Sequence, residues 1–425
     1  MERYNEYKDS GVQWLGEIPS HWGLRRTKYV WKETDSRSEF GSEQLLSVSQ
    51  YDGVREAQSD SRSESLKGYK IVKQDELVIN IMLAWLGGLG VSKHEGIVSP
   101  AYCVYKLQDA QNPRFLHYLY RTPMYLAEFA RHSTGIVPSR WRMYTDDFGE
   151  VLTLLPPIEE QDAMVAYLDT ATAKIDEAIA QQQKMIDLLN ERKQIIINNA
   201  VTKGLNPDAP MKDSGVDWIG KIPEHWEICK LKRVANGFSN GTSATQITFG
   251  TTPYSVTRIE TITTGSINYD KVGYVKKDSS LNRYLLKKND VLISNINSFE
   301  RVGNCAIYDG QHELYHGMNL LRITPLDNIV PEYLLYSLKS ANYMGQMRRA
   351  CKPAINQVSV PSSVVKGIII TFPPLSEQEE IAIYCSRALQ CIEDSVDNCK
   401  KQISLLQERK QIIINDVVTG KVKVS

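Results

Sequence analysis

Residues 188–202 read LLNERKQIIINNAVT, and residues 405–419 read LLQERKQIIINDVVT, so one stretch occurs twice at an offset of 217 residues. A second repeat keeps this offset, because PPIEEQ at 156–161 returns as PPLSEQ at 373–378. Two motifs with one common spacing indicate an internal duplication of the chain. Every local feature is therefore interpreted as one of two copies.

Apolar residues recur three and four positions apart between the two motifs of each copy. The predicted seam contains Val165, Leu168, Ile175, Ile179, Ile186, Leu189, Ile196, Leu389, Ile392, Val396, Ile403, Leu406 and Ile413. A seam of about five heptads is typical of a coiled coil rather than of a merely amphipathic helix. Lys193 and Lys410 interrupt the seam at the same place in both copies, and polar residues at such positions fix the register of paired helices.

Each copy therefore predicts one long helix, which begins after the Pro-Pro pair and ends before Gly204 or Gly420. The seam of one copy corresponds to about 54 Å of helix at ~1.5 Å per residue. We expect the two helices to bury their seams against each other in antiparallel orientation. The compact segment between them keeps the end of the first helix near the start of the second. Alternatively, each helix packs only on its own domain.

A tryptophan-containing motif opens each half of the chain. Residues 8–22 read KDSGVQWLGEIPSHW and residues 212–226 read KDSGVDWIGKIPEHW, at an offset of 204 residues. This Trp motif is rich in Gly and Pro, and its residues have no spacing typical of catalysis. We interpret it as a structural clamp that docks each domain on a helix end, with His21 and His225 as packing residues.

The regions between the Trp motif and the Pro-Pro pair differ in sequence but share an order of elements. Runs of β-branched and aromatic residues predict strands; they are LLSVS at 45–49, DELVINIM at 75–82, AYCVYKL at 101–107, YSVTRI at 254–259, DVLISNI at 290–296 and LLRIT at 320–324. A helical segment with proline in its first turn follows at 113–132 and at 331–350.

These elements predict an α+β fold, in which two mixed α/β domains are joined by two long antiparallel coiled-coil helices with pseudo-two-fold internal symmetry. We expect the first domain at residues 1–156 and the first helix at 157–204. The second domain follows at 205–373, and the second helix with the C-terminal tail occupies 374–425.

Length and composition are those of an ordinary globular protein. The 425 residues suggest about three units, and 42% hydrophobic with 24% charged residues is typical of soluble proteins. The sequence contains no apolar run near ~20 residues and no signal-peptide pattern at its start. The seven cysteines are odd in number and lack CxxC pairing, which predicts a reduced, cytoplasmic protein without disulfides or a zinc site.

The net charge of zero argues against a uniformly basic nucleic-acid binder. Residues 211–373 hold 19 Lys and Arg against 13 Asp and Glu, whereas residues 1–156 hold 19 against 20. A surface for a polyanion in the first half must therefore be a local patch.

A polar, basic loop follows each of the two shorter helical segments, at 131–143 and at 348–363. Arg can read guanine edges, Asn and Gln can read adenine edges, and Lys and Arg hold phosphates. The candidate DNA-binding residues are Arg131, Arg140, Arg142, Arg258, Arg348, Arg349, Lys352, Asn356 and Gln357. Alternatively, these are solvated loops that cap helix C-termini, where basic residues are common.

Motifs of the common catalytic sites are absent from the sequence. It has no GxxxxGK[ST] phosphate loop, no HExxH, and no [DN]PP[YF] motif of amino-methylating enzymes. WLGGLG at 85–90 lacks the GxGxxG order before a helix that a dinucleotide site requires. We therefore predict no catalytic residue, no metal site and no cofactor bound by this chain.

The combination KDSGVxWxGxIPxHW, PPxxEQ and ERKQIIIN, in this order in both halves, resembles the specificity subunit of type I restriction-modification systems. The resemblance covers the whole chain. It implies two target-recognition domains, each of which reads one half of a split double-stranded DNA target, and two antiparallel spacer helices. It also implies that the helices and flanking segments bind two methyltransferase (modification) subunits. The matched motifs belong to the scaffold, so the resemblance does not name DNA-reading residues.

The resemblance places the chemistry in partner subunits. Adenine-N6 methylation with S-adenosylmethionine is expected in the methyltransferase, and ATP and Mg in any restriction subunit. Because the two variable regions differ, we expect an asymmetric target, with at most about 16 base pairs between the readers at ~3.4 Å per base pair. Two alternatives remain: a protein–protein adaptor rod that does not bind DNA, and an enzyme with an unrecognised site shared by both halves.

Overall fold

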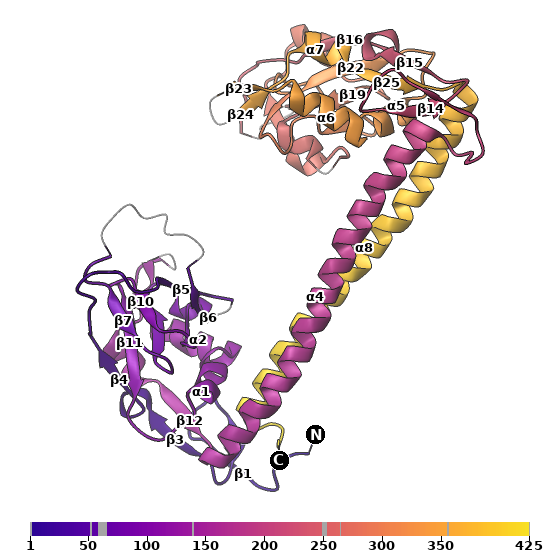
Figure 1. Cartoon of the computed structure of the whole chain (residues 1–425). Helices are drawn as coiled ribbons and strands as arrows, with labels where there is room; N and C mark the ends of the chain where they lie inside the picture. Colours follow the sequence, from indigo (N-terminus) through magenta and orange to yellow (C-terminus); the bar gives the residue numbers. More distant parts are fainter. Residues whose placement is uncertain are drawn as a thin grey trace. The chain divides into compact units, whose positions relative to one another are not determined.

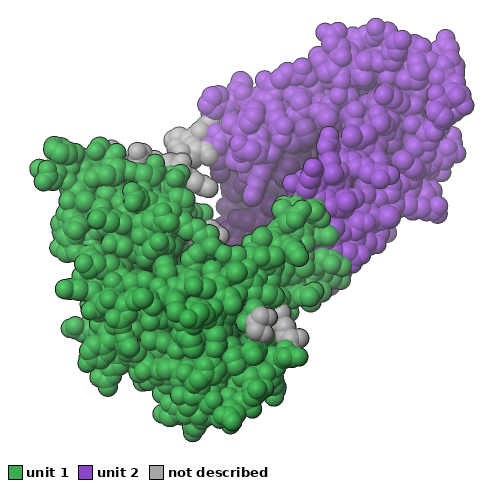
Figure 2. Space-filling view, turned by 60° about the horizontal axis from the view of Figure 1, so that its bottom comes forward, with its two compact units in different colours: residues 1–183, 400–425 green, residues 184–399 purple. Residues whose placement is uncertain are grey.

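The computed structural model describes residues 2–51, 53–57, 66–137, 140–248, 253–263, 265–354 and 357–424. The chain divides into two compact units, coloured separately in Figure 2: unit 1 contains residues 1–183 and 400–425, and unit 2 contains residues 184–399. Each unit therefore holds one variable region and one end of each long helix.

Two long helices dominate the secondary structure, as the heptad pattern predicts. They are α4 (Ile158–Lys203) and α8 (Leu375–Val418). Each begins directly after its Pro-Pro pair. Gly204 and Gly420 lie just beyond the two ends with φ of 74°, the left-handed conformation that commonly terminates a helix.

The two helices pack together and run antiparallel (Figure 1). In unit 1, Leu168 near the start of α4 shares a core with Val417 near the end of α8. In unit 2, Ala200 near the end of α4 shares a core with Cys385 near the start of α8. The predicted antiparallel pairing is confirmed, and the alternative in which each helix packs only on its own domain is wrong.

The predicted seam side chains all avoid full exposure. Val165, Leu168, Ile175, Ile186, Leu389 and Ile392 are buried, whereas Ile179, Leu189, Ile196, Val396, Ile403, Leu406 and Ile413 are partly buried. The more buried positions of each helix lie toward the domain that precedes it, where domain side chains add to the core.

The two seam lysines form ion pairs with the opposite helix. Lys193 Nζ lies 2.6 Å from Glu393 Oε1 in unit 2, and Lys410 Nζ lies 2.6 Å and 2.7 Å from the two carboxylate oxygens of Asp176 in unit 1. The internal repeat relates each lysine to the other and each acid to the other. Each unit therefore has one polar contact between the two helices, at positions that the internal repeat relates to each other.

We expect Lys193→Leu and Lys410→Leu to raise the midpoint of thermal unfolding and to loosen the helix register. Both lysines are under one third exposed and their carboxylate partners are over half exposed. Each pair therefore contributes roughly 0–1 kcal/mol, less than a leucine buried at the same position contributes. Lys184→Leu, at an exposed position of α4, is the matched control and should give no gain. Distances between spin labels on the two helices measure the register, and loss of folding would contradict the seam.

The variable regions contain short strands and helices. Unit 1 has β1 (Tyr7–Asp9), β2 (Glu17–Pro19), β3 (Gly23–Arg26), β4 (Trp31–Thr34), β5 (Leu46–Ser49), β6 (Gly53–Glu56), β7 (Lys70–Val72), β8 (Leu77–Asn80), β9 (Leu89–Val91), β10 (Gly96–Val98), β11 (Tyr102–Leu107), α1 (Pro113–Tyr120), α2 (Pro123–Arg131), α3 (Thr145–Glu150) and β12 (Leu152–Leu155).

Unit 2 repeats this order with longer connections. It has β13 (Met211–Asp213), β14 (Lys221–Pro223), β15 (Glu227–Lys230), β16 (Ala235–Asn240), β17 (Tyr254–Val256), β18 (Gly273–Val275), β19 (Val291–Ile293), β20 (Ile296–Asn297), β21 (Cys305–Ile307), β22 (Leu321–Pro325), α5 (Pro331–Ser337), α6 (Ala341–Arg349), β23 (Lys352–Ala354), β24 (Gln357–Ser359), α7 (Ser362–Gly367) and β25 (Ile369–Phe372).

A four-stranded antiparallel sheet is the centre of each domain. Its order is β4-β11-β8-β9 in unit 1 and β16-β22-β19-β21 in unit 2. Along β8, Leu77 and Ile79 face the core formed with α1 and α2, whereas Val78 faces a second core formed with β5 and β6. This alternation follows from the two-residue period of a strand. Each run predicted as a strand contains one, so the predicted α+β class is confirmed.

Each predicted helical segment is split into two helices. Thr122 accepts a hydrogen bond from the backbone N–H of Tyr125 and begins α2, while Ser340 accepts one from Tyr343 and begins α6. A side-chain oxygen at this position replaces a missing helical partner and starts a new helix. The split turns α2 and α6 against the end of the central strands, where the two basic loops start.

Within the described part of the chain, every helix is too short or too polar to span a bilayer.

Candidate nucleic-acid interface

The Trp motif and the PPxxEQ motif bind each other in both units. In unit 1, the indole N–H of Trp22 donates to Glu160 Oε2 at 3.0 Å, and His21 Nε2 lies 2.6 Å from Glu160 Oε1. In unit 2, Trp226 and His225 hold the carboxylate of Glu377 at 2.9 Å and 2.6 Å. The Trp motif is therefore a clamp on the start of each long helix.

The two histidines, predicted to be packing residues, also make polar contacts. His21 and His225 are 44% and 49% exposed, and each lies against the carboxylate. The ring of His21 in addition contacts the ring of Tyr4, with centroids 5.7 Å apart. The tryptophans beside them are the buried members of the motif, since both are about 1% exposed or less.

The glutamine of PPxxEQ holds the first of the two short helices in each domain. Gln161 accepts from the backbone N–H of Asn112 at 2.9 Å and donates to the carbonyl of Pro156 at 2.8 Å. Gln378 makes the same two bonds, from Val330 and to Pro373. Both glutamines are fully buried, so α1 and α5 are placed by one identical device.

The Trp motif also contacts the end of the other long helix. A Cβ at Gly420 would lie 2.9 Å from the ring of Trp22, and one at Gly204 would lie 3.1 Å from the ring of Trp226. Each motif thus joins the start of one long helix to the end of the other. What differs between the units is the set of loops that this common scaffold carries.

Each basic loop is tied to the end of the central strand. Met143 donates its backbone N–H to the carbonyl of Ile81 at 3.0 Å, and Val360 donates to the carbonyl of Asn295 at 2.8 Å. The loop after α2 and the loop after β8 therefore form one surface in unit 1. The loop after α6 and the loop after β19 form the equivalent surface in unit 2.

In unit 2, three of the predicted residues gather on this surface. Lys352 and Gln357 are exposed on the small sheet β20-β24-β23. The guanidinium of Arg348 lies 6.0 Å from the ring centroid of Phe299, which follows β20. Two cations and one amide, with the exposed ring of Phe299 near Arg348, suit contacts with phosphates and base edges. Asn356 lies outside the described residues.

Two other predicted residues of unit 2 lie elsewhere. Arg349 stacks its guanidinium over Trp218 of the Trp motif at 4.6 Å and donates to the carbonyl of Gly345. Arg258, at the start of a 3-10 turn, lies 3.5 Å from a carboxylate oxygen of Glu260. The structure therefore does not bring Arg349 and Arg258 into the group around Arg348.

In unit 1, the predicted arginines have different environments. Arg131 is held by the nearly buried carboxylate of Glu128, with contacts of 2.8 Å and 2.5 Å. Burial raises the pKa of Glu128, but the hydrogen bonds and charge of Arg131 outweigh it and lower that pKa. Arg140 is exposed, whereas Arg142 donates to the carbonyl of Trp141. The charge available to a ligand is thus that of Arg140 and Arg142.

Comparison with known proteins identifies the scaffold. Residues 223–403 match the family of the type I restriction modification DNA specificity domain. A Methanocaldococcus jannaschii protein, provisionally assigned as the type I restriction enzyme MjaX specificity subunit, is 38% identical over 205 residues, which are 47% of each chain. The Escherichia coli type I restriction enzyme EcoKI specificity subunit is 25% identical over 256 residues, which are 59% of this chain and 52% of that relative.

The family match covers less than half of the chain, and the matched segments span about half the length of these curated relatives. A solved structure titled "Structural basis underlying complex assembly and conformational transition of the type I R-M system" covers 95% of this chain and 99% of its own, with a TM-score of 0.70 and 16% identity. That likeness shows that the two chains share a fold over most of their length.

One set of surface residues has no signal in the sequence. Met82, Leu83 and Leu86 are exposed on the loop after β8, and Phe299 is exposed on the loop after β19. Residues 81 and 82 belong to a run predicted as a strand, but β8 ends at Asn80. Apolar residues in a sequence suggest a core, and only the fold reveals that these face outward.

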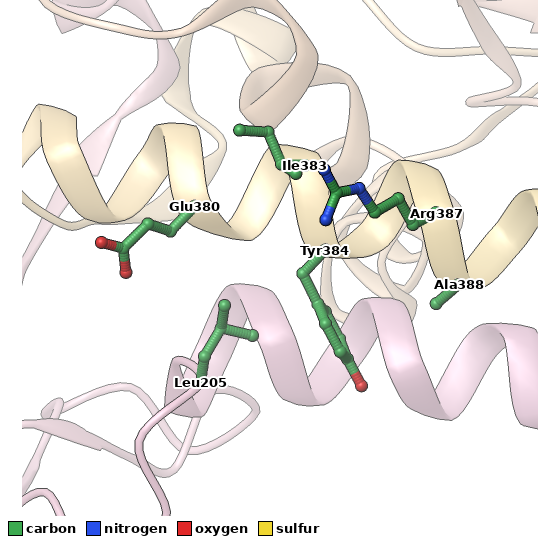
Figure 3. Close-up of a pocket in the computed structure, with 6 residues that line it drawn as sticks. All are labelled: Leu205, Glu380, Ile383, Tyr384, Arg387 and Ala388. Atoms are coloured by element: carbon green, nitrogen blue, oxygen red, sulfur yellow. The ribbon is translucent and has the colours of Figure 1, made fainter.

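A further feature of unit 2 is an open pocket of about 570 Å³. Figure 3 shows its residues, five from α8 and one just after α4: Leu205, Glu380, Ile383, Tyr384, Arg387 and Ala388. The set has no pair of groups arranged for acid–base or nucleophilic chemistry. In the part of the chain that the structure describes, no group of three or more His, Cys, Asp or Glu side chains is placed to hold a metal ion.

Proposed function

We propose that this chain is the non-catalytic DNA-recognition subunit of a type I restriction-modification complex. Each half reads one part of a split, asymmetric target in double-stranded DNA. In this proposal residues 1–156 and 205–373 are the target-recognition domains, and residues 157–204 and 374–425 are the spacer helices with the C-terminal tail. The observation that carries the proposal is one scaffold built twice with two unlike loop surfaces.

The contacts of the scaffold support the proposal that the chain contains two DNA-recognition domains. Glu160 and Glu377 are clamped by equivalent Trp and His side chains at nearly the same distances. Two domains held identically have no structural need to differ at their loop surfaces. The differences between Arg140 and Arg142 in unit 1 and Lys352 and Gln357 in unit 2 are therefore best explained by two unlike half-sites.

Methylome sequencing of cells that carry this chain with its partner methyltransferase tests the proposal. We expect one bipartite adenine-methylated motif with unlike halves, because the two loop surfaces differ. Cells with the methyltransferase alone are the control and should lack this motif. A palindromic motif, or methylation that does not depend on this chain, would contradict the proposal and favour a protein–protein adaptor.

We infer that the exposed face of α8 in unit 2 docks a methyltransferase subunit. Ile383 is 53% exposed and Tyr384 is 46% exposed, and Leu205 adds to the same apolar surface (Figure 3). Exposed aromatic and aliphatic side chains around an arginine, here Arg387, are typical of interface centres. In the proposal this partner brings S-adenosylmethionine and the adenine-N6 chemistry, and restriction subunits with ATP and Mg can join it.

Ile383→Asp should reduce co-purification of the methyltransferase by at least about tenfold, because a carboxylate in an apolar contact is desolvated without a partner. The thermal midpoint of the isolated chain should stay unchanged, since the position is exposed. Ser404→Asp, an exposed position farther along α8, adds the same charge as a matched control. Equal co-purification of both variants would remove this face from the interface.

A further inference from the structure

Exposed apolar side chains gather on three adjoining loops of unit 1. The loop after β8 carries Met82, Leu83 and Leu86, and the loop after α2 carries Ile136, which is 96% exposed. Tyr51, in the turn between β5 and β6, is 80% exposed. Large apolar side chains on a soluble domain are usually scattered, so this concentration indicates a binding surface.

Named contacts hold the three loops together. The rings of Trp85 and Trp141 meet edge to face, with centroids 5.3 Å apart, and join the loop after β8 to the loop after α2. Arg121 donates to the carbonyl of Gly87 at 2.8 Å and to that of Tyr51 at 2.6 Å. These contacts hold the three loops against one another, while the apolar side chains of the loops face solvent.

The charge of two of these three loops has one sign, whereas the turn between β5 and β6 contains Asp52 in its sequence. Residues 81–91 and residues 131–143 contain no Asp or Glu, and the second stretch contributes Arg140 and Arg142. A surface that is apolar at its centre and positive at its edge fits a polyanion that also offers apolar groups. A partner protein surface would need acidic groups to complement the same edge.

The equivalent surface of unit 2 has another chemistry. Its position, set by the bond between Val360 and Asn295, matches the position set by the bond between Met143 and Ile81. There, the guanidinium of Arg348 lies 6.0 Å from the ring centroid of Phe299, which is 49% exposed, and the exposed residues that follow this ring, Glu300 and Arg301, are charged. The loop surface of unit 1 is therefore mainly apolar at the position where the loop surface of unit 2 carries mainly polar and charged groups.

Thymine is the base whose major-groove edge carries a methyl group, and apolar side chains contact that group. Resting on the proposed function, we propose that unit 1 reads its half of the target through thymine C5-methyl groups. Leu83, Leu86 and Ile136 supply these contacts, and Arg140 and Arg142 bind the flanking phosphates. Unit 2 reads its half mainly through hydrogen bonds.

Deoxyuridine tests this inference, because it removes only the methyl group from thymine. The assembled complex with its methyltransferase is titrated against its target duplex, once the methylation map has defined it, with thymines replaced in one half at a time. We expect replacement of thymine in the half that unit 1 reads to weaken binding about fourfold per contacted methyl group. Replacement in the half that unit 2 reads should leave the affinity unchanged.

A double variant assigns the effect to the surface. Leu83→Ala with Ile136→Ala should weaken binding to the thymine duplex and reduce the difference between thymine and deoxyuridine in that half. Both positions are exposed, so the thermal midpoint should not move. Tyr29→Ala removes another exposed apolar side chain of unit 1, outside the three loops, and should leave binding unchanged.

The results that would contradict the inference can be distinguished from those that would contradict the proposed function. Equal affinity for thymine and deoxyuridine in both halves, or a target with thymine in neither half, overturns the inference while specific binding upholds the proposed function. Failure of the complex to bind any specific DNA overturns the proposed function itself. If the double variant loses the methyltransferase instead of the thymine preference, the surface belongs to a protein contact and the inference is wrong.

Discussion

Replacing Glu160 and Glu377 together by alanine is expected to destabilise both units, by roughly 2–4 kcal/mol in unit 1 and roughly 1–3 kcal/mol in unit 2. In unit 1 the carboxylate accepts from Trp22 and from the hydroxyl of Tyr4, and Trp22 is 1% exposed. Its loss leaves buried donors without an acceptor, which costs more than a hydrogen bond contributes. The midpoint of urea unfolding and limited proteolysis measure the effect.

The neighbouring acids provide the control for this substitution. Glu159 lies in the first turn of α4 and Glu379 lies just beyond the first turn of α8, and both are exposed. Their double alanine variant removes the same two charges from the helix N-termini, so it should show only the dipole effect of roughly 0.3–1 kcal/mol per site. If the two double variants unfold at the same urea concentration, the clamp does not depend on these carboxylates.

The dependence of stability on pH provides an independent test of the same clamp. Burial raises the pKa of Glu160, but hydrogen bonds from His21, Trp22 and Tyr4 outweigh it and hold that pKa below its ordinary value. A carboxylate with a lowered folded-state pKa stabilises the fold above its unfolded-state pKa, and the contribution is lost as pH falls through the folded value. The stability of Glu160→Ala should therefore fall less steeply in acid than that of the parent chain.

The helices were predictable because their signals are local. A five-heptad seam and one repeated offset are legible without knowledge of any contact, and the antiparallel order follows from connectivity. The Trp motif was predicted to clamp a helix end, and the structure confirms this. The individual contacts were not predictable, since Trp22 and Glu160 are 138 residues apart and neither stretch marks the other. The contact of His21 with the same carboxylate was missed for the same reason.

The candidate surface was predictable only in outline. Adjacent residues on a helix do not face the same side. Arg348 therefore meets Phe299 while Arg349 meets Trp218. The neutralisation of Arg131 had a visible signal, because Glu128 precedes it by three residues and such pairs lie side by side on a helix. Exposure of an apolar residue has no local signal, which is why the loop after β8 was missed.

Arg348→Ala with Lys352→Ala is expected to weaken binding of the assembled complex to its target by about tenfold or more per residue. Each substitution removes a cation from the surface formed by β20, β23 and β24. An arginine that binds a guanine edge contributes about 1–3 kcal/mol, and a lysine on a phosphate adds about one unit to the slope of log affinity against log salt. Fluorescence anisotropy at several salt concentrations gives both quantities.

Arg349→Ala is the matched control, because it removes an identical side chain from the adjacent position. Its guanidinium lies over Trp218 of the Trp motif, so we expect little change in affinity and no change in the salt slope. Thermal midpoints of all variants show whether folding is retained. If Arg349→Ala weakens binding as much as Arg348→Ala, the protein offers DNA the opposite side of α6. If neither does, unit 2 reads DNA through other loops, and an unaltered salt slope in every variant would favour an adaptor that never contacts DNA.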